Sequence, residues 1–221
     1  MSSFKQELMW IKDRDPACRN LIEAYMFNAG FHAIRSYRRA HKLFCKGHFF
    51  RARLISQISR FWTGIEIHPG ATIGEYLFID HGSGIVIGET TEIGDHCMLY
   101  QGVTLGGTGK DLGKRHPTLG HGVLVGAGAK VLGPVTIGDG AKIAAGAVVL
   151  TDVPGGATAV GVPARIARMG GVRVEDETSA LDHARIVDPV SQELCRLSGM
   201  IDAMKKRIDE LESGHPTSHK D

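Results

Sequence analysis

Cysteine is scarce in this sequence, and its four copies form no recognisable framework. Cys18, Cys45, Cys97 and Cys195 include no CxxC pair among the 221 residues. Structural disulfides and a thiolate zinc site are therefore not expected, and we predict no bound metal. Reduced thiols of this kind are typical of cytosolic proteins.

Long apolar runs and a charge excess are also missing. No stretch of about 18 consecutive apolar residues could span a bilayer, and charges interrupt the N-terminal MSSFKQELMWIKDRDPA where a signal peptide needs an apolar centre. The net charge is +2, from 26 basic and 24 acidic residues, which gives no broad field to attract nucleic acid. We predict a soluble, cytoplasmic protein that binds neither membrane nor nucleic acid.

Glycine is abundant, with 29 copies against 8 prolines and 6% aromatic residues, which suggests many turns with positive φ. The first 62 residues differ, because glycine is sparse there and apolar residues fall at helical spacing. Ser3 and Gln6 suggest a capping box, and Pro16 is expected to open a second helical segment. Residues 1–62 therefore predict an N-terminal helical domain.

From Gly64 onward, a branched aliphatic residue recurs every six positions. The beat slips by two residues once and is interrupted once, and it runs through Ile67, Ile73, Ile79, Ile87, Ile93, Leu99, Leu105, Leu119, Val125, Val131, Ile137, Ile143 and Val149. Neither a helix nor an alternating strand has this period, whereas a hexapeptide β-helix does. Three hexads close one triangular coil, and the coils stack about 4.8 Å apart. We predict an α+β protein whose residues 63–168 form a parallel β-helix.

One insertion interrupts the repeat at residues 106–118, with the sequence GGTGKDLGKRHPT. A long loop inside a regular solenoid suggests a function, although a tolerated surface insertion is the simpler alternative. Residues 169–221 begin as a charged linker and then carry apolar residues at spacings of four and three. This pattern predicts either a coiled coil or a single amphipathic helix.

Several segments resemble the serine acetyltransferase family of hexapeptide-repeat acyltransferases. They are RDPA at 14–17, IHPGATIG at 67–74, IDHGSGIVIGET at 79–90, QGVTLGGTGK at 101–110, KRHP at 114–117 and GVPARI at 161–166. The resemblance implies a left-handed β-helix preceded by helices, a homotrimer or dimer of trimers with active sites between subunits, and acetylation of L-serine by acetyl-CoA in cysteine biosynthesis. It also implies inhibition by L-cysteine. The family's partner, O-acetylserine sulfhydrylase, grips a terminal isoleucine, so this sequence is not expected to bind it in that way.

The resemblance also assigns catalytic roles. His81 matches the family's catalytic histidine and is expected to act as general base, because a serine hydroxyl is a weak nucleophile at neutral pH. The family's orienting aspartate falls on Glu66, which has one methylene more. Substrate-binding roles fall on Asp15 and Asp80 for the ammonium and on Arg115 for the carboxylate, and His116 matches a second family position in the substrate pocket.

Acetyl-CoA is expected along a prism edge near the inserted loop. Ala127 and Ala145 are 18 residues apart and should stack at one corner, which would leave room for the pantetheine arm, although corners favour small residues in any case. Gly107 is a candidate oxyanion donor. The candidates for contacting the phosphates are Lys110, Lys142 and Arg165.

Three other functions fit parts of the sequence. A hexapeptide acetyltransferase acting on a sugar or another small hydroxyl compound would use a similar histidine. A β-helical zinc carbonic anhydrase could draw ligands from His81, His116 and His121. A scaffold trimer without catalytic activity is the third alternative.

Overall fold

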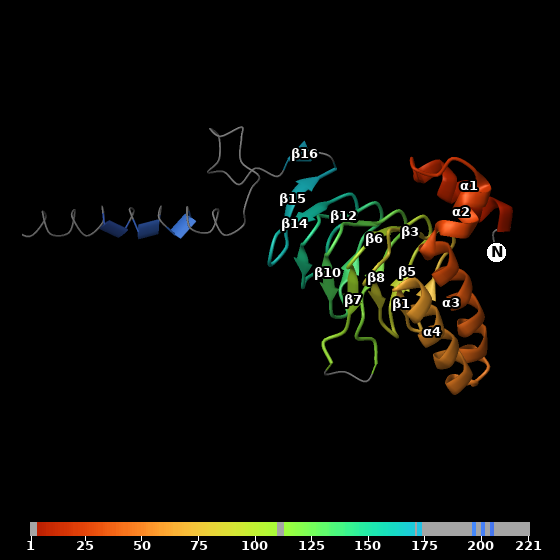
Figure 1. Ribbon diagram of the computed structural model, residues 1–221. Helices are drawn as coiled ribbons and strands as arrows, with labels where there is room; N and C mark the ends of the chain where they lie inside the picture. The colour runs from red at the N-terminus through yellow and green to blue at the C-terminus, as the bar shows by residue number, and fades with distance from the viewer. Residues whose placement is uncertain are drawn as a thin grey trace, which may run out of the picture. The chain divides into compact units, whose positions relative to one another are not determined.

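The computed structural model describes residues 4–109, 113–170 and 172–173, with the short helical pieces 196–197, 200–201 and 204–205. Four helices precede a stack of short strands (Figure 1): α1 (Phe4–Arg14), α2 (Leu21–Phe27), α3 (Ala29–Cys45) and α4 (Phe49–Thr63). Most of the predicted C-terminal heptad helix lies outside the described residues, so the coiled coil stays a prediction.

The strands form the three faces of a prism. The first face contains β1 (Glu66–Ile67), β4 (Val86–Ile87), β7 (Thr104–Gly106), β10 (Lys130–Leu132) and β13 (Val148–Val149). The second contains β2 (Thr72–Ile73), β5 (Glu92–Ile93), β8 (Thr118–Leu119) and β11 (Thr136–Ile137). The third contains β3 (Phe78–Asp80), β6 (Met98–Tyr100), β9 (Leu124–Val125), β12 (Lys142–Ile143) and β14 (Thr158–Val160), followed by β15 (Arg165–Met169) and β16 (Val172–Arg173).

The predicted repeat accounts for the core. Every aliphatic residue of the beat is buried, and each one pairs in parallel with the corresponding residue of a neighbouring coil, as Ile67 does with Ile87 and Ile87 with Leu105. The prism ends where β15 turns back and pairs antiparallel with β14. The parallel β-helix and its preceding helices are therefore confirmed.

The two-residue slip in the repeat forms a protruding corner. Residues 81–85 connect β3 to β4, whereas only residues 101–103 make the corresponding turn in the next coil, because Asp80 pairs with Tyr100 and Val86 pairs with Thr104. The two extra residues push out the corner that begins with His81. The irregularity in the sequence thus coincides with the predicted catalytic histidine.

The α3–α4 hairpin covers the open end of the prism. Carbonyl groups of the first coil have no preceding coil to pair with, and an exposed sheet edge of this kind needs a cover. Side chains of the hairpin supply the missing donors: the Tyr37 hydroxyl donates to the Ala71 carbonyl at 2.6 Å, and the Ser56 hydroxyl donates to the Ile67 carbonyl at 2.7 Å. Arg38 donates to the Ile73 and Gly74 carbonyls.

We expect Tyr37→Phe to lower the free energy of unfolding by about 1–3 kcal/mol, because the buried Ala71 carbonyl loses its donor. Burial raises the pKa of Tyr37 to about 12, so the hydroxyl is protonated and able to donate. Urea unfolding followed by circular dichroism measures the change. Tyr25→Phe is the matched control, since Tyr25 is 47% exposed. Equal unfolding midpoints for the two variants would contradict this account of the covered edge.

The first two helices are held against the side of the prism. Leu8 and Ile11 of α1 form a buried cluster with Ala24, Phe31 and the prism residue Phe78. Helix α2 begins at Leu21 and not at Pro16, because the Asn20 side chain accepts hydrogen bonds from the first-turn N–H groups of residues 22 and 23. The predicted start was therefore five residues too early.

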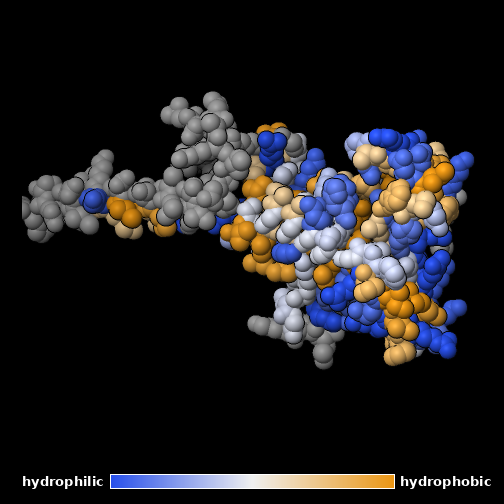
Figure 2. Space-filling view, in the orientation of Figure 1, coloured by the Kyte–Doolittle hydropathy of each residue, from blue (hydrophilic) through white to orange (hydrophobic). Residues whose placement is uncertain are grey.

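Helix α4 carries an exposed apolar stripe. Phe50, Leu54, Ile58 and Trp62 are spaced four residues apart along its outer side, and Phe61 lies beside them. Phe50 and Phe61 are each 81% exposed, and apolar side chains gather over the hairpin in Figure 2. An apolar patch of this kind usually marks an interaction surface. None of the described helices combines the length and apolar character that a bilayer span requires.

Candidate active site

A cavity of about 430 Å³ lies between the helical region and the protruding corner. Its lining includes Asp15 from the turn after α1, Asp80 at the end of β3, and His81. We call these three residues the acid–imidazole group. The volume falls in the usual range for small-molecule sites. The helical region therefore contributes to the cavity, and the substrate-binding role of Asp15 stays a prediction.

His81 is the most accessible member of this group. Its side chain is 74% exposed, and Nε2 lies 3.7 Å from Asp80 Oδ1. Its backbone φ is +57°, a left-handed conformation that is uncommon outside glycine. Unusual backbone geometry of this kind is often found at functional sites. The imidazole can reach a proton on a ligand in the cavity while Asp80 stands beside it.

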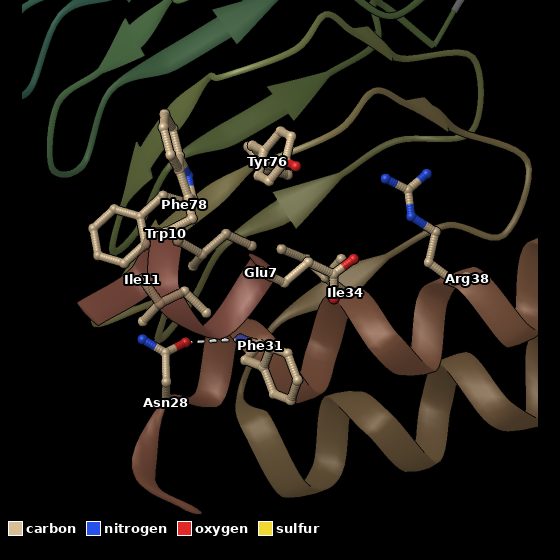
Figure 3. Close-up of a pocket in the computed structure, with 11 residues that line it drawn as sticks. Glu7, Trp10, Ile11, Asn28, Phe31, Ile34, Arg38, Tyr76 and Phe78 are labelled. Atoms are coloured by element: carbon tan, nitrogen blue, oxygen red, sulfur yellow. Dashed lines mark hydrogen bonds between the residues drawn. The ribbon is translucent and has the colours of Figure 1, made fainter. Parts of the chain in front are cut away.

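The turn that carries Asp15 is held by a hydrogen bond within it and by packing just before it. Asp15 Oδ1 accepts a hydrogen bond from the Ala17 N–H at 2.9 Å, which orients the carboxylate within its own turn. Before this turn, the Arg14 guanidinium packs over the Trp10 ring, 3.1 Å from its centroid. Trp10 in turn packs against Tyr76 of the first coil, with ring centroids 5.3 Å apart, and both rings line a small cavity (Figure 3). These contacts fix the Asp15 carboxylate relative to the prism.

Glu66 has a different contact from the one predicted. Its Oε2 atom lies 3.1 Å from the Arg60 guanidinium of α4, and the contacts of the described residues include none between Glu66 and His81. The carboxylate that does stand beside the imidazole is that of Asp80. Glu66 as the orienting acid therefore stays a prediction.

Arg115 and His116 belong to a second cluster at another corner, where β4 turns into β5. Arg115 forms an ion pair with Glu89, and Lys114 Nζ lies 2.9 Å from Glu92 Oε1. We call Lys114, Arg115 and His116 the cationic group. Its acidic and hydroxyl partners are Glu89, Thr90 and Glu92. The sequence does not identify them as functional residues, because their contacts with the end of the inserted loop join segments that are more than 20 residues apart.

Several pKa values in this cluster depart from their usual range. Burial lowers the pKa of His116, with a further contribution from Arg115. Burial likewise lowers the pKa of His68, which lies nearby. The hydrogen bond from Arg115 lowers the pKa of Glu89. At neutral pH the cluster therefore combines two neutral imidazoles with an ionised carboxylate and a guanidinium.

The two groups are separated within one chain. The acid–imidazole group lies at the corner between the third and first faces, and the cationic group lies at the corner between the first and second faces. One face of a hexad, at most about 20 Å across, lies between them. No contact joins the two groups among the described residues.

The cofactor candidates divide between the two corners. Ala127 and Ala145 follow β9 and β12 and stack on successive coils, as the Gly146 N–H bond to the Ala127 carbonyl shows. They stand on the same prism edge as His81. Gly107 lies at the other corner, because a Cβ on it would approach Arg115 and the His116 ring. Lys110 lies outside the described residues.

The edge that carries Ala127 and Ala145 has a glycine in each of four coils. Gly84, Gly102, Gly128 and Gly146 all have φ between +70° and +74°, and each donates its N–H to the coil before it. We call these four residues the glycine edge. Lys142 and Arg165 lie on the third face, on strands β12 and β15, with β14 between them. The edge is smooth because none of its four turns carries a Cβ there.

Comparison with known proteins places this geometry in a family. A model described as serine acetyltransferase, N-terminal, matches residues 1–36, and one described as bacterial transferase hexapeptide (six repeats) matches residues 116–151. The curated serine acetyltransferase of Bacillus subtilis is 49% identical over 93% of this chain and 97% of its own length. The chain belongs to the serine acetyltransferase family. The Staphylococcus aureus (strain Mu50) member is 46% identical over 97% of this chain and 99% of its own length.

Solved family structures support the same assignment. The chain resembles the Neisseria gonorrhoeae serine acetyltransferase with 43% identity and a TM-score of 0.71, over 73% of this chain and 65% of that one. A soybean serine acetyltransferase complexed with serine gives 44% identity and a TM-score of 0.70, over 72% and 66% of the two chains. The chain thus spans slightly less than two thirds of these two solved chains. The prism matches their left-handed β-helix of hexapeptide repeats.

These relatives favour none of the alternative functions. All are named for serine acetylation, not for sugar acetylation or carbonic anhydrase activity. In the structure His116 Nδ1 contacts Thr90, whereas His121 Nδ1 contacts the Asp95 N–H at a different corner. Within the described residues, no group of three or more His, Cys, Asp or Glu side chains is arranged to hold a metal ion.

Proposed function

We propose that this chain is a serine O-acetyltransferase that converts L-serine and acetyl-CoA into O-acetyl-L-serine and CoA, the first step of cysteine biosynthesis. One observation carries the proposal: the cavity that brings Asp15, Asp80 and His81 together. A cytoplasmic location remains a prediction.

His81 acts as general base. Its imidazole takes the proton from the serine hydroxyl while that oxygen attacks the thioester carbonyl of acetyl-CoA. The tetrahedral intermediate then expels the CoA sulfur, which takes up the proton from the imidazolium. Asp80, 3.7 Å from Nε2, stabilises the imidazolium in the meantime. Gly107 lies beside Arg115 and His116, so in the proposed site a second copy of the chain supplies the Gly107 N–H that donates to the developing oxyanion. Glu66 is the second candidate for orienting His81.

Serine recognition uses both corners. The carboxylates of Asp15 and Asp80 suit its ammonium, and the Arg115 fork and His116 suit its carboxylate. Because one face of the prism separates these groups, we propose that a second copy of the chain supplies the cationic group. In a homotrimer or a dimer of trimers, rotational symmetry would place the cationic group of one chain beside the acid–imidazole group of its neighbour. The exposed apolar stripe on α4 supports an assembly that covers it.

Acetyl-CoA is proposed to lie along the glycine edge with its thioester toward His81. Absent Cβ atoms leave the backbone of this edge accessible to the pantetheine arm, and Ala127 and Ala145 continue the smooth surface. The edge between the second and third faces differs, because Tyr76 and His96 occupy its first two coils and their rings stack there. Lys142 and Arg165 are the proposed phosphate contacts, together with Lys110.

L-cysteine is the proposed inhibitor at the serine position. One solved serine acetyltransferase, 44% identical to this chain, is described as a complex with cysteine. Cysteine differs from serine only by sulfur in place of oxygen, so the same ammonium and carboxylate contacts serve both. Competition with serine is the form of inhibition that follows.

The proposed function is tested by following CoA release with a panel of acceptors. We expect serine to be turned over at least about 100-fold faster than a galactoside, because a site that binds ammonium and carboxylate leaves these groups unpaired when a sugar occupies it. Homoserine tests the position of the hydroxyl relative to His81. Equal rates with galactosides and serine would favour the sugar acetyltransferase, and no release with any amino acid would overturn the proposal.

A further inference from the structure

The segment at residues 88–92, with the sequence GETTE, runs from the turn after β4 to the first residue of β5 and contacts every side chain of the cationic group. Lys114 Nζ donates to the Thr90 carbonyl at 2.7 Å as well as to Glu92. Arg115 pairs with Glu89. His116 Nδ1 lies 2.9 Å from the Thr90 hydroxyl. All three side chains at the end of the inserted loop therefore have their partners in one short segment of the chain.

The hydrogen bonds of Thr90 assign the tautomer of His116. The Thr90 hydroxyl oxygen accepts from the N–H groups of Arg115 and His116, both at 3.1 Å. With two donors on the oxygen, the hydroxyl hydrogen is left to donate, and His116 Nδ1 is the acceptor within reach. The Thr90 N–H also donates to Nδ1, at 3.2 Å. A nitrogen that accepts these bonds carries no proton, so the proton of the neutral ring lies on Nε2.

The surroundings of the ring keep it in this state and place. His116 is 9% exposed, and its ring packs on Gly88 so closely that a Cβ there would overlap it. The charged or titratable groups that face it are Arg115 and Lys114 on its own segment, Glu89 on the turn, and His68 beyond β1. Burial is the largest influence on the pKa of His116 and lowers it.

We propose that Thr90 is a positioning residue that holds His116 as the neutral tautomer with its proton on Nε2. His116 then offers a directed N–H to an anionic oxygen of the ligand without carrying a charge of its own. What this donor binds rests on the proposed serine acetyltransferase function, but the tautomer itself does not. Glu89 orients the Arg115 guanidinium through their ion pair, so both donors are in place before a ligand binds.

A purely structural role for Thr90 would also explain its backbone contacts, so the test must separate the two. Thr90→Val removes the hydroxyl with little change in volume, and Thr90→Ser retains the hydroxyl. Thr90→Ala is a second hydroxyl-free variant in case the valine side chain disturbs the turn. The whole protein is labelled with ¹⁵N-histidine, and His116→Gln identifies the resonances of His116.

We expect the wild type and Thr90→Ser to show a protonated Nε2 and an unprotonated Nδ1. Thr90→Val and Thr90→Ala should raise the pKa of His116 by roughly one unit, because they lose a donor that opposes protonation of Nδ1. At acidic pH the kcat/KM for serine should fall more steeply in the two hydroxyl-free variants than in the wild type, because protonation of His116 then adds to protonation of the His81 base, and Thr90→Ser should keep the wild-type profile.

The outcomes distinguish the inference from the proposed function. A wild-type ring protonated on Nδ1, or a pKa of His116 that is the same in the serine, valine and alanine variants, would overturn the role of Thr90. A shifted pKa without any acetyl transfer to serine would support the tautomer and count against the proposed function.

Discussion

His81→Asn is expected to lower kcat by about 10²- to 10⁴-fold, the range that a general base contributes. Asparagine cannot take the serine proton at neutral pH, yet it tolerates the left-handed conformation that His81 adopts with φ of +57°. Because the histidine side chain is 74% exposed, the fold should lose little stability. Loss of rate without loss of structure is therefore the expected result.

His96→Asn is the matched control for this variant. His96 also has a left-handed backbone, with φ of +60°, but its ring stacks on Tyr76 outside the proposed cavity. CoA release and thermal unfolding should be measured for both variants. We expect His96→Asn to retain its rate to within a few-fold, and any loss of stability to be larger there than at residue 81. A His81→Asn enzyme with an unchanged kcat would remove the general base from the mechanism.

The repeat was readable from the sequence because each hexad is a local unit with one inward position. Ile67, Leu105 and Val149 could be placed in the core from spacing alone, and the structure buries all three. The two-residue slip was visible as well. Its consequence was not, since the protruding corner only becomes apparent when residues 81–85 are paired against residues 101–103.

Contacts between distant segments could not be predicted in the same way. Glu66 meets Arg60 because α4 folds back over the first coil, and no local pattern indicates that approach. Arg115 follows Glu89 by 26 positions, and most of the inserted loop lies between them. Burial and ion pairing at such sites depend on how the loop rejoins the prism, which a six-residue period does not describe.

A mixture of two inactive variants is expected to regain activity if the site is shared between copies. His81→Asn disables the acid–imidazole group, and Arg115→Ala disables the cationic group by removing the guanidinium that pairs with Glu89. In a mixed oligomer, an Arg115→Ala chain still offers an intact His81, and a neighbouring His81→Asn chain still offers an intact Arg115. Random association of equal amounts would then make about one quarter of the sites complete.

The measurement is CoA release after the two variants are denatured and refolded together, compared with each variant refolded alone. His81→Asn mixed with Asp80→Asn is the control, because both changes fall in the same group and no pairing of chains completes a site. Each single variant should retain about 1% of the wild-type rate or less, so recovery toward one quarter is easily distinguished. If the mixed oligomers form and regain nothing beyond this control, the two corners do not meet across a subunit boundary. Serine recognition by Arg115 would then have to be abandoned, since within one chain the prism face keeps that guanidinium away from His81.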